Sequence, residues 1–146
     1  MKLSIGSDHA GYDLKKEIIS FLQSKGHDVI DYGVKSPESV DYPDFALTVA
    51  DSVATKKYEL GILICGTGTG MAITANKVRG IRAANCLTSE MAELARSHNN
   101  ANVLCMGARL IDSENAKAIT EKFIATNFEA GRHELRVLKI HSLTGL

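Results

Sequence analysis

The segment from Cys65 to Gly70 holds residue types that could do chemistry together. It reads Cys-Gly-Thr-Gly-Thr-Gly and directly follows an apolar run. Glycines at alternate positions let backbone amides converge on an anion, and a helix that begins there adds the positive end of its dipole. The segment therefore predicts an anion-binding turn beside a thiol. The alternative is a tight strand-to-helix turn that binds nothing.

Three better-known loops do not fit this segment. A Walker A loop needs a lysine directly after its last glycine, and none follows closely here. The dinucleotide pattern GxGxxG needs a glycine at position 71, and the phosphatase pattern Cys-x5-Arg needs an arginine there, but the residue is Met71. The pattern that remains is a small nest of backbone amides at a helix N-terminus.

The three cysteines are not equivalent in position. An ordinary thiol is only about 3% ionised at pH 7. Cys65 stands where loop amides and a helix N-terminus would favour the thiolate, so it could act as a base or a nucleophile. Packing as a small apolar residue is the alternative for Cys65, and it is the preferred interpretation for Cys86 and Cys105. The spacing of the three predicts neither a zinc site nor a disulfide framework.

Polar residues also lie near the ends of other predicted strands. Asp8 and His9 follow the first strand, Arg109 follows the fifth, and His98 and Asn99 close the helix ahead of the fifth. Ligands bind outside the carboxyl ends of the strands in an open parallel sheet, so we expect both histidines at ligand-facing ends. Asp8, His9 and His98 lack a compact metal-binding spacing, and we expect no metal.

The last segment of the chain carries Arg132 and Arg136, four residues apart. On a helix the two guanidinium groups share one face, which suits a phosphate. The alternative is an exposed basic face balanced by Glu129 and Glu134. His141, in the same segment, is expected at the surface.

Apolar runs of strand length alternate with amphipathic segments along the whole chain. Strands are predicted at 3–7, 28–32, 60–65, 81–86 and 102–106, and helices at 11–26, 42–56, 71–77, 89–98, 112–128 and 130–146. Five such β-α units predict an α/β fold, a parallel sheet with helices on both faces. The pattern does not reveal the strand order.

Composition points to one soluble domain. The 146 residues are 45% hydrophobic and 23% charged, which fits a single globular domain over 1–146. The 17 basic residues balance the 17 acidic ones, which argues against a broad surface for nucleic acid or an anionic membrane. The N-terminal apolar run is too short and too polar for a signal peptide or a membrane span. We therefore expect a cytoplasmic protein.

Five segments occur in a recognisable order: GSDHAG, VDYPD, ILICGTGTGMAITANK, RSHNNANVLCMGAR and GRHELRV. Together they span nearly the whole chain and resemble the ribose-5-phosphate isomerase B family, in a group that includes the galactose-6-phosphate isomerase subunits. The resemblance implies a Rossmann-like, three-layer α/β/α fold with strand order 2-1-3-5-4. It also implies a homodimer, sometimes paired into a tetramer. The implied reaction interconverts D-ribose 5-phosphate and D-ribulose 5-phosphate without metal or cofactor, as in the pentose phosphate pathway.

The resemblance also implies roles for individual residues. Cys65 would be the base that moves a proton between C1 and C2, and His98 would donate the proton that opens the sugar ring, with Asp8 near the ring oxygens. Some relatives use a glutamate after the loop instead, but this chain has the cysteine. The remaining residues implied to contact the substrate are Gly66, Thr67, Gly68, Thr69 and Gly70 around the enediolate and sugar, His9, Arg132 and Arg136 at the phosphate, and Asn99 and Arg109.

Two questions stay open at this point. In the family the site is built from two subunits, which would give the tail at 130–146 a docking place on a partner. The substrate could instead be a six-carbon phosphate, such as allose or galactose 6-phosphate. A non-catalytic sugar-phosphate sensor is the alternative from another class, but it would be expected to have lost Cys65 or His98.

Overall fold

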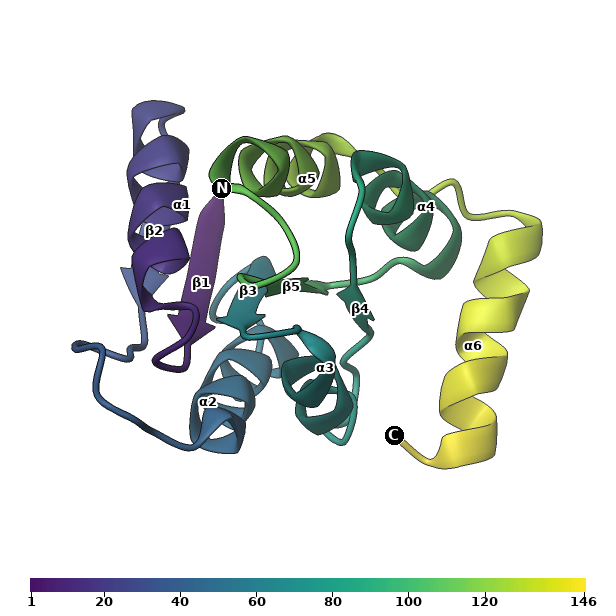
Figure 1. The fold of residues 1–146 in the computed structure, drawn as a ribbon. Helices are drawn as coiled ribbons and strands as arrows, with labels where there is room; N and C mark the ends of the chain where they lie inside the picture. Colours follow the sequence, from purple (N-terminus) through teal and green to yellow (C-terminus); the bar gives the residue numbers. More distant parts are fainter.

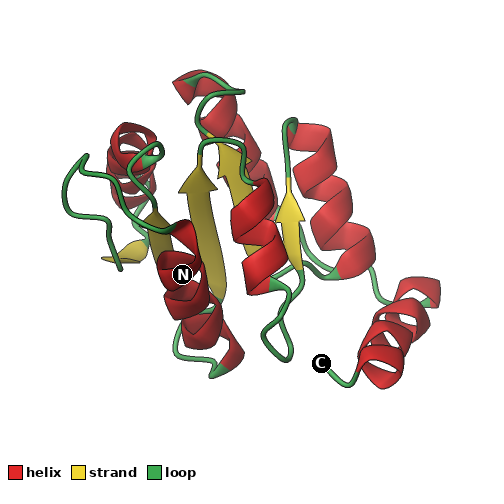
Figure 2. Cartoon of the chain, turned by 60° about the horizontal axis from the view of Figure 1, so that its bottom comes forward, coloured by secondary structure: helices red, strands yellow, loops and turns green.

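Five parallel strands form one sheet in the computed structural model, which describes residues 1–146 (Figure 1; Figure 2). The strands are β1 (Lys2–Ser7), β2 (Asp28–Asp31), β3 (Leu60–Cys65), β4 (Ala83–Asn85) and β5 (Val103–Gly107). Their order is β2-β1-β3-β5-β4, which confirms the order implied by the resemblance. β1, β3 and β5 therefore lie in the middle of the sheet, with their carboxyl ends side by side.

Five of the helices cover the two faces of the sheet, and the sixth lies outside these layers. The helices are α1 (Tyr12–Ser24), α2 (Tyr42–Ala54), α3 (Thr69–Ala75), α4 (Ser89–Asn99), α5 (Ser113–Ala125) and α6 (Arg132–Thr144). α1, α4 and α5 pack on one face, and α2 and α3 pack on the other (Figure 1). The predicted three-layer α/β fold is therefore confirmed.

β3 shows how the sheet divides the core in two. All six of its residues are buried, as expected for an apolar strand between two helical layers. Ile62 and Ile64 pack toward the α1, α4 and α5 layer, whereas Leu63 and Cys65 pack toward the α2 and α3 layer. Successive side chains of a strand point to opposite faces, so the last residue of β3 brings its thiol to the α2 and α3 side.

Several element ends differ from the prediction. β4 is shorter than 81–86, because the Arg82 N–H donates to the Asn102 side chain over 2.8 Å instead of continuing the strand ladder. α5 ends at Ala125, short of position 128, because Thr126 takes an extended conformation with ψ 130°. α3 begins at Thr69, inside the glycine segment rather than after it.

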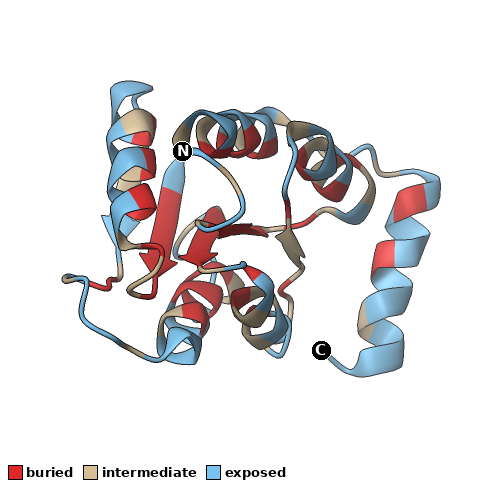
Figure 3. Ribbon diagram, viewed as in Figure 1, coloured by how far each residue is buried: buried red, intermediate tan, exposed pale blue.

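α6 packs against α4 at one end of the sheet and leaves most of its surface uncovered (Figure 1; Figure 3). Only His133 and Val137 of this helix are buried. Leu135, Leu138 and Leu143 are 71%, 60% and 75% exposed. None of the helices in the chain combines the length and the apolar character that a membrane crossing requires.

Candidate active site

The carboxyl ends of the three central strands bring the first group of predicted site residues together. The Asp8 N–H donates to the Ile64 carbonyl over 3.2 Å, so the turn after β1 is bonded to the end of β3. The turn after β5 is bonded to the same strand end, since the Arg109 N–H donates to the Gly66 carbonyl over 3.0 Å. Asp8, the glycine loop and Arg109 therefore share one edge of the sheet, as predicted.

Cys65 lies under the glycine loop and receives a hydrogen bond from it. The Gly68 N–H lies 3.1 Å from the Cys65 Sγ, and the thiol residue is only 5% exposed. Gly68 has φ +79°, a left-handed conformation that favours glycine. The Gly68 N–H is therefore directed at the atom that would act as the base or nucleophile.

The other two cysteines fit the packing interpretation. Burial raises the pKa of Cys86 to about 11. Burial also raises the pKa of Cys105 well above its ordinary value, and the nearby Cys65 and Cys86 raise it further. Both thiols therefore stay protonated near neutral pH and take no part in acid–base chemistry there.

Two glycines of this edge, Gly107 and Gly70, allow neighbouring segments to approach the loop closely. One of these contacts also identifies a residue that the sequence did not single out. A Cβ at Gly107 would lie 2.7 Å from the carbonyl carbon of Thr67, so β5 can approach the loop only with a glycine there. A Cβ at Gly70 would lie 2.6 Å from Cζ of Tyr42. The half-exposed phenol of Tyr42, at the N-terminus of α2, therefore lies against the loop. Tyr42 belongs to the VDYPD segment, but the sequence alone does not show that this segment lies beside Gly70.

Asp8 and His9 form the next part of this edge. Asp8 is buried and its Oδ1 accepts the Gly11 N–H over 3.1 Å, which leaves the other carboxylate oxygen free of protein donors. The Nδ1 of His9 accepts the Val40 N–H over 3.3 Å. This bond assigns the proton of the neutral imidazole to Nε2, which makes no hydrogen bond within the chain.

A buried lysine fixes the loop beside these two residues. Lys15 is fully buried, and its Nζ lies 2.6 and 2.8 Å from the carboxylate oxygens of Asp31 and 2.7 Å from the Val34 carbonyl oxygen. Val34 in turn donates its N–H to Ser7, directly ahead of Asp8. The sequence pattern places Lys15 in the amphipathic helix predicted at 11–26. Its role could not be found there because its acceptors are 16 and 19 residues away.

His98 and Asn99 lie at the opposite edge of the sheet, which corrects the expectation that His98 faces the same edge as Cys65. α4 connects two parallel strands, so it must run back to their amino ends before β5 begins. The segment that follows His98 bonds the start of β3, where the Gly61 N–H donates to the Asn102 carbonyl. Gly61 is four residues before Cys65, or about 13 Å along the strand. Within one chain, His98 and Cys65 therefore lie at opposite edges of the sheet.

The turn after His98 is held by two arginines that the sequence analysis did not single out. The Nε of Arg82 donates to the carbonyls of Asn99 and Asn100 over 3.1 and 2.8 Å. The Nη1 of Arg96 donates to the Ala101 carbonyl over 2.5 Å. Burial lowers the pKa of both guanidinium groups, but both remain charged at neutral pH. The turn that directly follows His98 is therefore held by hydrogen bonds from two charged side chains.

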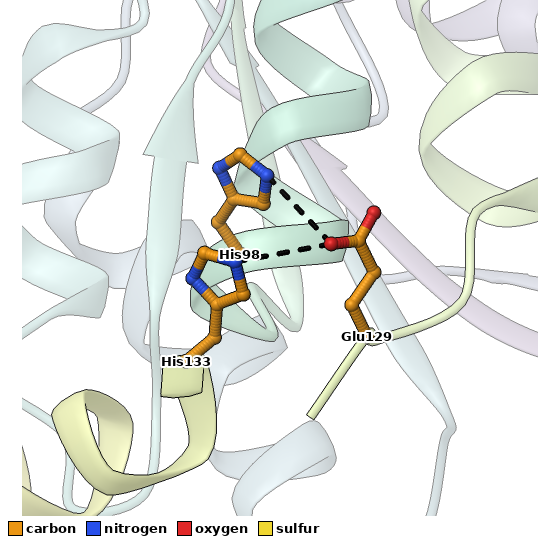
Figure 4. A group of neighbouring side chains, drawn as sticks. All are labelled: His98, Glu129 and His133. Carbon is orange, nitrogen blue, oxygen red and sulfur yellow. Dashed lines mark ion pairs between the residues drawn. The ribbon is translucent and has the colours of Figure 1, made fainter. Parts of the chain in front are cut away.

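His98 forms a cluster with His133 of α6 and with Glu129 (Figure 4). The two imidazole rings stack with centroids 4.2 Å apart and planes 6° from parallel. The Oε2 of Glu129 lies 3.9 Å from the His98 Nε2 and 3.8 Å from the His133 Nε2. Burial lowers the pKa of His133, the charges of His98 and Arg132 lower it further, and Glu129 opposes them.

The same cluster is the one group of side chains spaced closely enough to hold a metal ion, with ligand atoms within 4.8 Å of one another. Its geometry suits a metal poorly. A histidine binds metal along a ring-nitrogen lone pair in the ring plane, and a single ion cannot lie in two planes that are stacked and nearly parallel. The neighbouring Arg132 also disfavours a cation.

Arg132 and Arg136 are exposed on the outer face of α6. Glu129, expected as a balancing charge, lies against the two histidines. His141 is not a free surface residue as expected, since its Nε2 lies 2.9 Å from Nη1 of Arg82 and its ring is half-buried. Within one chain, α6 therefore contacts His98 and Arg82, near the amino edge of the sheet and away from Cys65.

The fold and this edge define a class of protein: a small α/β protein of the kind that binds small molecules outside the carboxyl ends of its parallel strands. The sequence profile of the ribose/galactose isomerase family matches residues 3–140. The chain therefore belongs to this family.

Individual relatives agree with the family assignment. A Clostridium thermocellum ribose-5-phosphate isomerase B structure matches with a TM-score of 0.98 and 50% identity, covering 99% of this chain and 98% of that one. The Mycoplasma genitalium enzyme, solved with bound ribulose-5-phosphate, matches with a TM-score of 0.95 and 44% identity, covering 99% and 96%. In sequence, ribose-5-phosphate isomerase B of Escherichia coli is 45% identical over 97% of this chain and 95% of its own length.

Proposed function

We propose that this protein interconverts D-ribose 5-phosphate and D-ribulose 5-phosphate. The observation that carries the proposal is the Cys65 thiol under the glycine loop, with the Gly68 N–H directed at its sulfur. Membership of the isomerase family and the likeness to a structure that holds ribulose-5-phosphate support this choice of substrate.

The chemistry of the reaction matches the residues at the carboxyl edge. An aldose becomes a ketose when a base removes the proton from C2 and returns it to C1, with the negative charge of the enediolate carried on O1 and O2 in between. Cys65 is the base, and the amides and hydroxyls from Gly66 to Gly70 stabilise the enediolate oxygens. Asp8, His9 and Arg109 contact the sugar phosphate from the neighbouring turns. Remote phosphate contacts also hold C1 and C2 against the thiolate.

The acid for ring opening and the phosphate-binding arginines come from a second copy of the chain in this proposal. His98, Arg132 and Arg136 lie away from Cys65 within one chain, although the reaction needs their chemistry at one site. The apolar face of α6, with exposed Leu135 and Leu143, is the kind of surface that a partner subunit covers. Tail 130–146 then docks across a homodimer, and each site takes its base from one subunit and its arginines from the other.

Coupled assays of the purified protein with ribose 5-phosphate, allose 6-phosphate and galactose 6-phosphate test the choice of substrate. We expect kcat/KM for ribose 5-phosphate to exceed the other two by at least about tenfold, since each extra carbon must fit a pocket of fixed depth. A higher value for either six-carbon sugar would replace ribose 5-phosphate as the substrate. Binding without turnover of any of the three would indicate a sensor.

Replacing His98 separates ring opening from isomerisation. Ribose 5-phosphate is mostly a closed furanose, whereas ribulose 5-phosphate cannot close a comparable ring. We expect His98→Asn to lower turnover of ribose 5-phosphate by about 10²-fold, in the range of general acid–base catalysis. The kcat for ribulose 5-phosphate should fall less, because this substrate needs no ring opening. Saturating rates are compared, since the equilibrium constant fixes the ratio of the two kcat/KM values. Equal losses in both directions would exclude a dedicated ring-opening role for His98.

A further inference from the structure

Asn85 lies behind the glycine loop and hydrogen-bonds the residues on both sides of Gly68. Its Nδ2 donates to the Thr67 carbonyl over 3.1 Å and to the Thr69 Oγ1 over 3.3 Å. The residue closes β4 and is in register with Cys105 of β5, so its backbone is held by the sheet. The Asn85 side chain thus hydrogen-bonds the residues before and after Gly68 in the turn that covers Cys65.

Gly68 is packed tightly between Asn85 and the end of β5. A Cβ at Gly68 would lie 2.2 Å from the Asn85 Oδ1 and 2.9 Å from the carbonyl carbon of Met106. The peptide N–H of Gly68 is the donor that lies 3.1 Å from the Cys65 Sγ. The position of this donor therefore depends on the side chain that packs against Gly68 from behind.

The orientation of the Asn85 amide carries an energetic cost. Its Oδ1 is buried and has no hydrogen-bond partner. A buried acceptor without a partner is destabilising, and an apolar side chain of the same size would avoid that cost. The amide cannot turn over to relieve it, because its oxygen would then face the Thr67 carbonyl, a second acceptor. The two donated hydrogen bonds thus fix a single orientation of the side chain.

We propose that Asn85 is a positioning residue for Cys65. It holds the Gly68 N–H on the sulfur, which favours the thiolate, and it keeps the loop amides aimed at the place where the enediolate forms. The proposal rests on the proposed role of Cys65 as the base.

Asn85→Ala tests the proposal against Asn76→Ala as a matched control. Asn76 also hydrogen-bonds β4 through its side-chain amide, to Ala83 at 2.8 and 2.9 Å, but these bonds do not involve the glycine loop. The first measurement is the rate of Cys65 alkylation by iodoacetamide at pH 7 without any sugar phosphate, with the modified residue identified by peptide mass. The second is kcat and KM for ribose 5-phosphate.

We expect Asn85→Ala to slow Cys65 alkylation by about tenfold, the size of effect that follows from weakening one hydrogen bond to a charged group. kcat should fall by a similar factor, with KM within about threefold, because the change acts on the base. Asn76→Ala should leave both rates within about twofold of the wild-type values. Asn85→Asp keeps the shape but not the donors, and it should show at least the same losses.

The two measurements separate this proposal from the proposed function. Alkylation needs no substrate, so an unchanged alkylation rate in both Asn85 variants overturns the positioning role even if the protein acts on another sugar. Slower alkylation with unchanged kcat also overturns the positioning role, since Asn85 would then affect the reactivity of the thiol without contributing to turnover. Parallel losses in Asn85→Ala and Asn76→Ala would show a general effect of β4, and the role would be rejected.

Discussion

Replacing Cys65 by alanine is expected to lower kcat for ribose 5-phosphate by about 10²- to 10⁴-fold, the usual contribution of a positioned general base. KM should stay within a few-fold, because the lost interaction belongs to the transition state and not to substrate binding. Steady-state kinetics of the purified variant measure both values. Iodoacetamide should also inactivate the wild-type protein, and bound sugar phosphate should protect it.

Cys86→Ala is the matched control for this experiment. Its thiol is equally buried, but burial keeps it protonated, with a pKa raised to about 11, and it packs in the core on the other face of the sheet. The control should lose some thermal stability and keep its kcat. If Cys65→Ala retains most of its turnover, the base must be another group beside the glycine loop.

The position of Cys65 could be predicted because the signals for it are local. A fully apolar run followed by alternating glycines indicates a buried strand that ends in a tight turn, and the residue between the two must lie at the carboxyl edge. The turns that hold Asp8 and Arg109 follow strands in the same way. Parallel pairing then brings the three turns together whatever their separation along the chain.

His98 shows a limit of prediction from residues that lie next to strands in the sequence. It also lies beside a strand in the sequence, but it precedes β5 instead of following it, and a helix that joins parallel strands ends at the opposite edge. Lys15 and Asn85 show a second limit. Each acts through hydrogen bonds to residues that are distant along the chain, and nothing in their local sequence identifies those partners.

The outer face of α6 shows a third limit of prediction from the sequence, because a single chain does not contain the surface that would cover this face. The sequence predicted the helix and the shared face of Arg132 and Arg136. The structure adds that this face is exposed and that the helix is held to its own chain through His133 and Val137. The site that the arginines are proposed to serve therefore involves a second copy of the chain.

Loss of Arg132 or Arg136 is expected to weaken substrate binding strongly. A hydrogen bond to a charged group contributes about 1.5–3 kcal/mol, which corresponds to about 10- to 150-fold in affinity. The double variant Arg132→Ala/Arg136→Ala should therefore have little activity at ordinary substrate concentrations. Steady-state kinetics should show KM rising more than kcat falls, so a high concentration of ribose 5-phosphate should restore part of the rate.

Mixing two inactive chains tests whether the arginines and Cys65 come from different subunits. We expect co-expressed Cys65→Ala and Arg132→Ala/Arg136→Ala chains to regain activity, since one of the two sites in each heterodimer then carries neither change. A purified heterodimer with two affinity tags should show about half of the wild-type kcat per dimer, as one intact site of two requires. The control places all three substitutions on one chain and pairs it with the wild-type chain. In that heterodimer each site carries one defect, so it should be inactive. If instead the control is half-active and the first heterodimer is dead, Cys65 and the arginines serve one site from the same chain, and α6 must then reach the carboxyl edge of its own subunit.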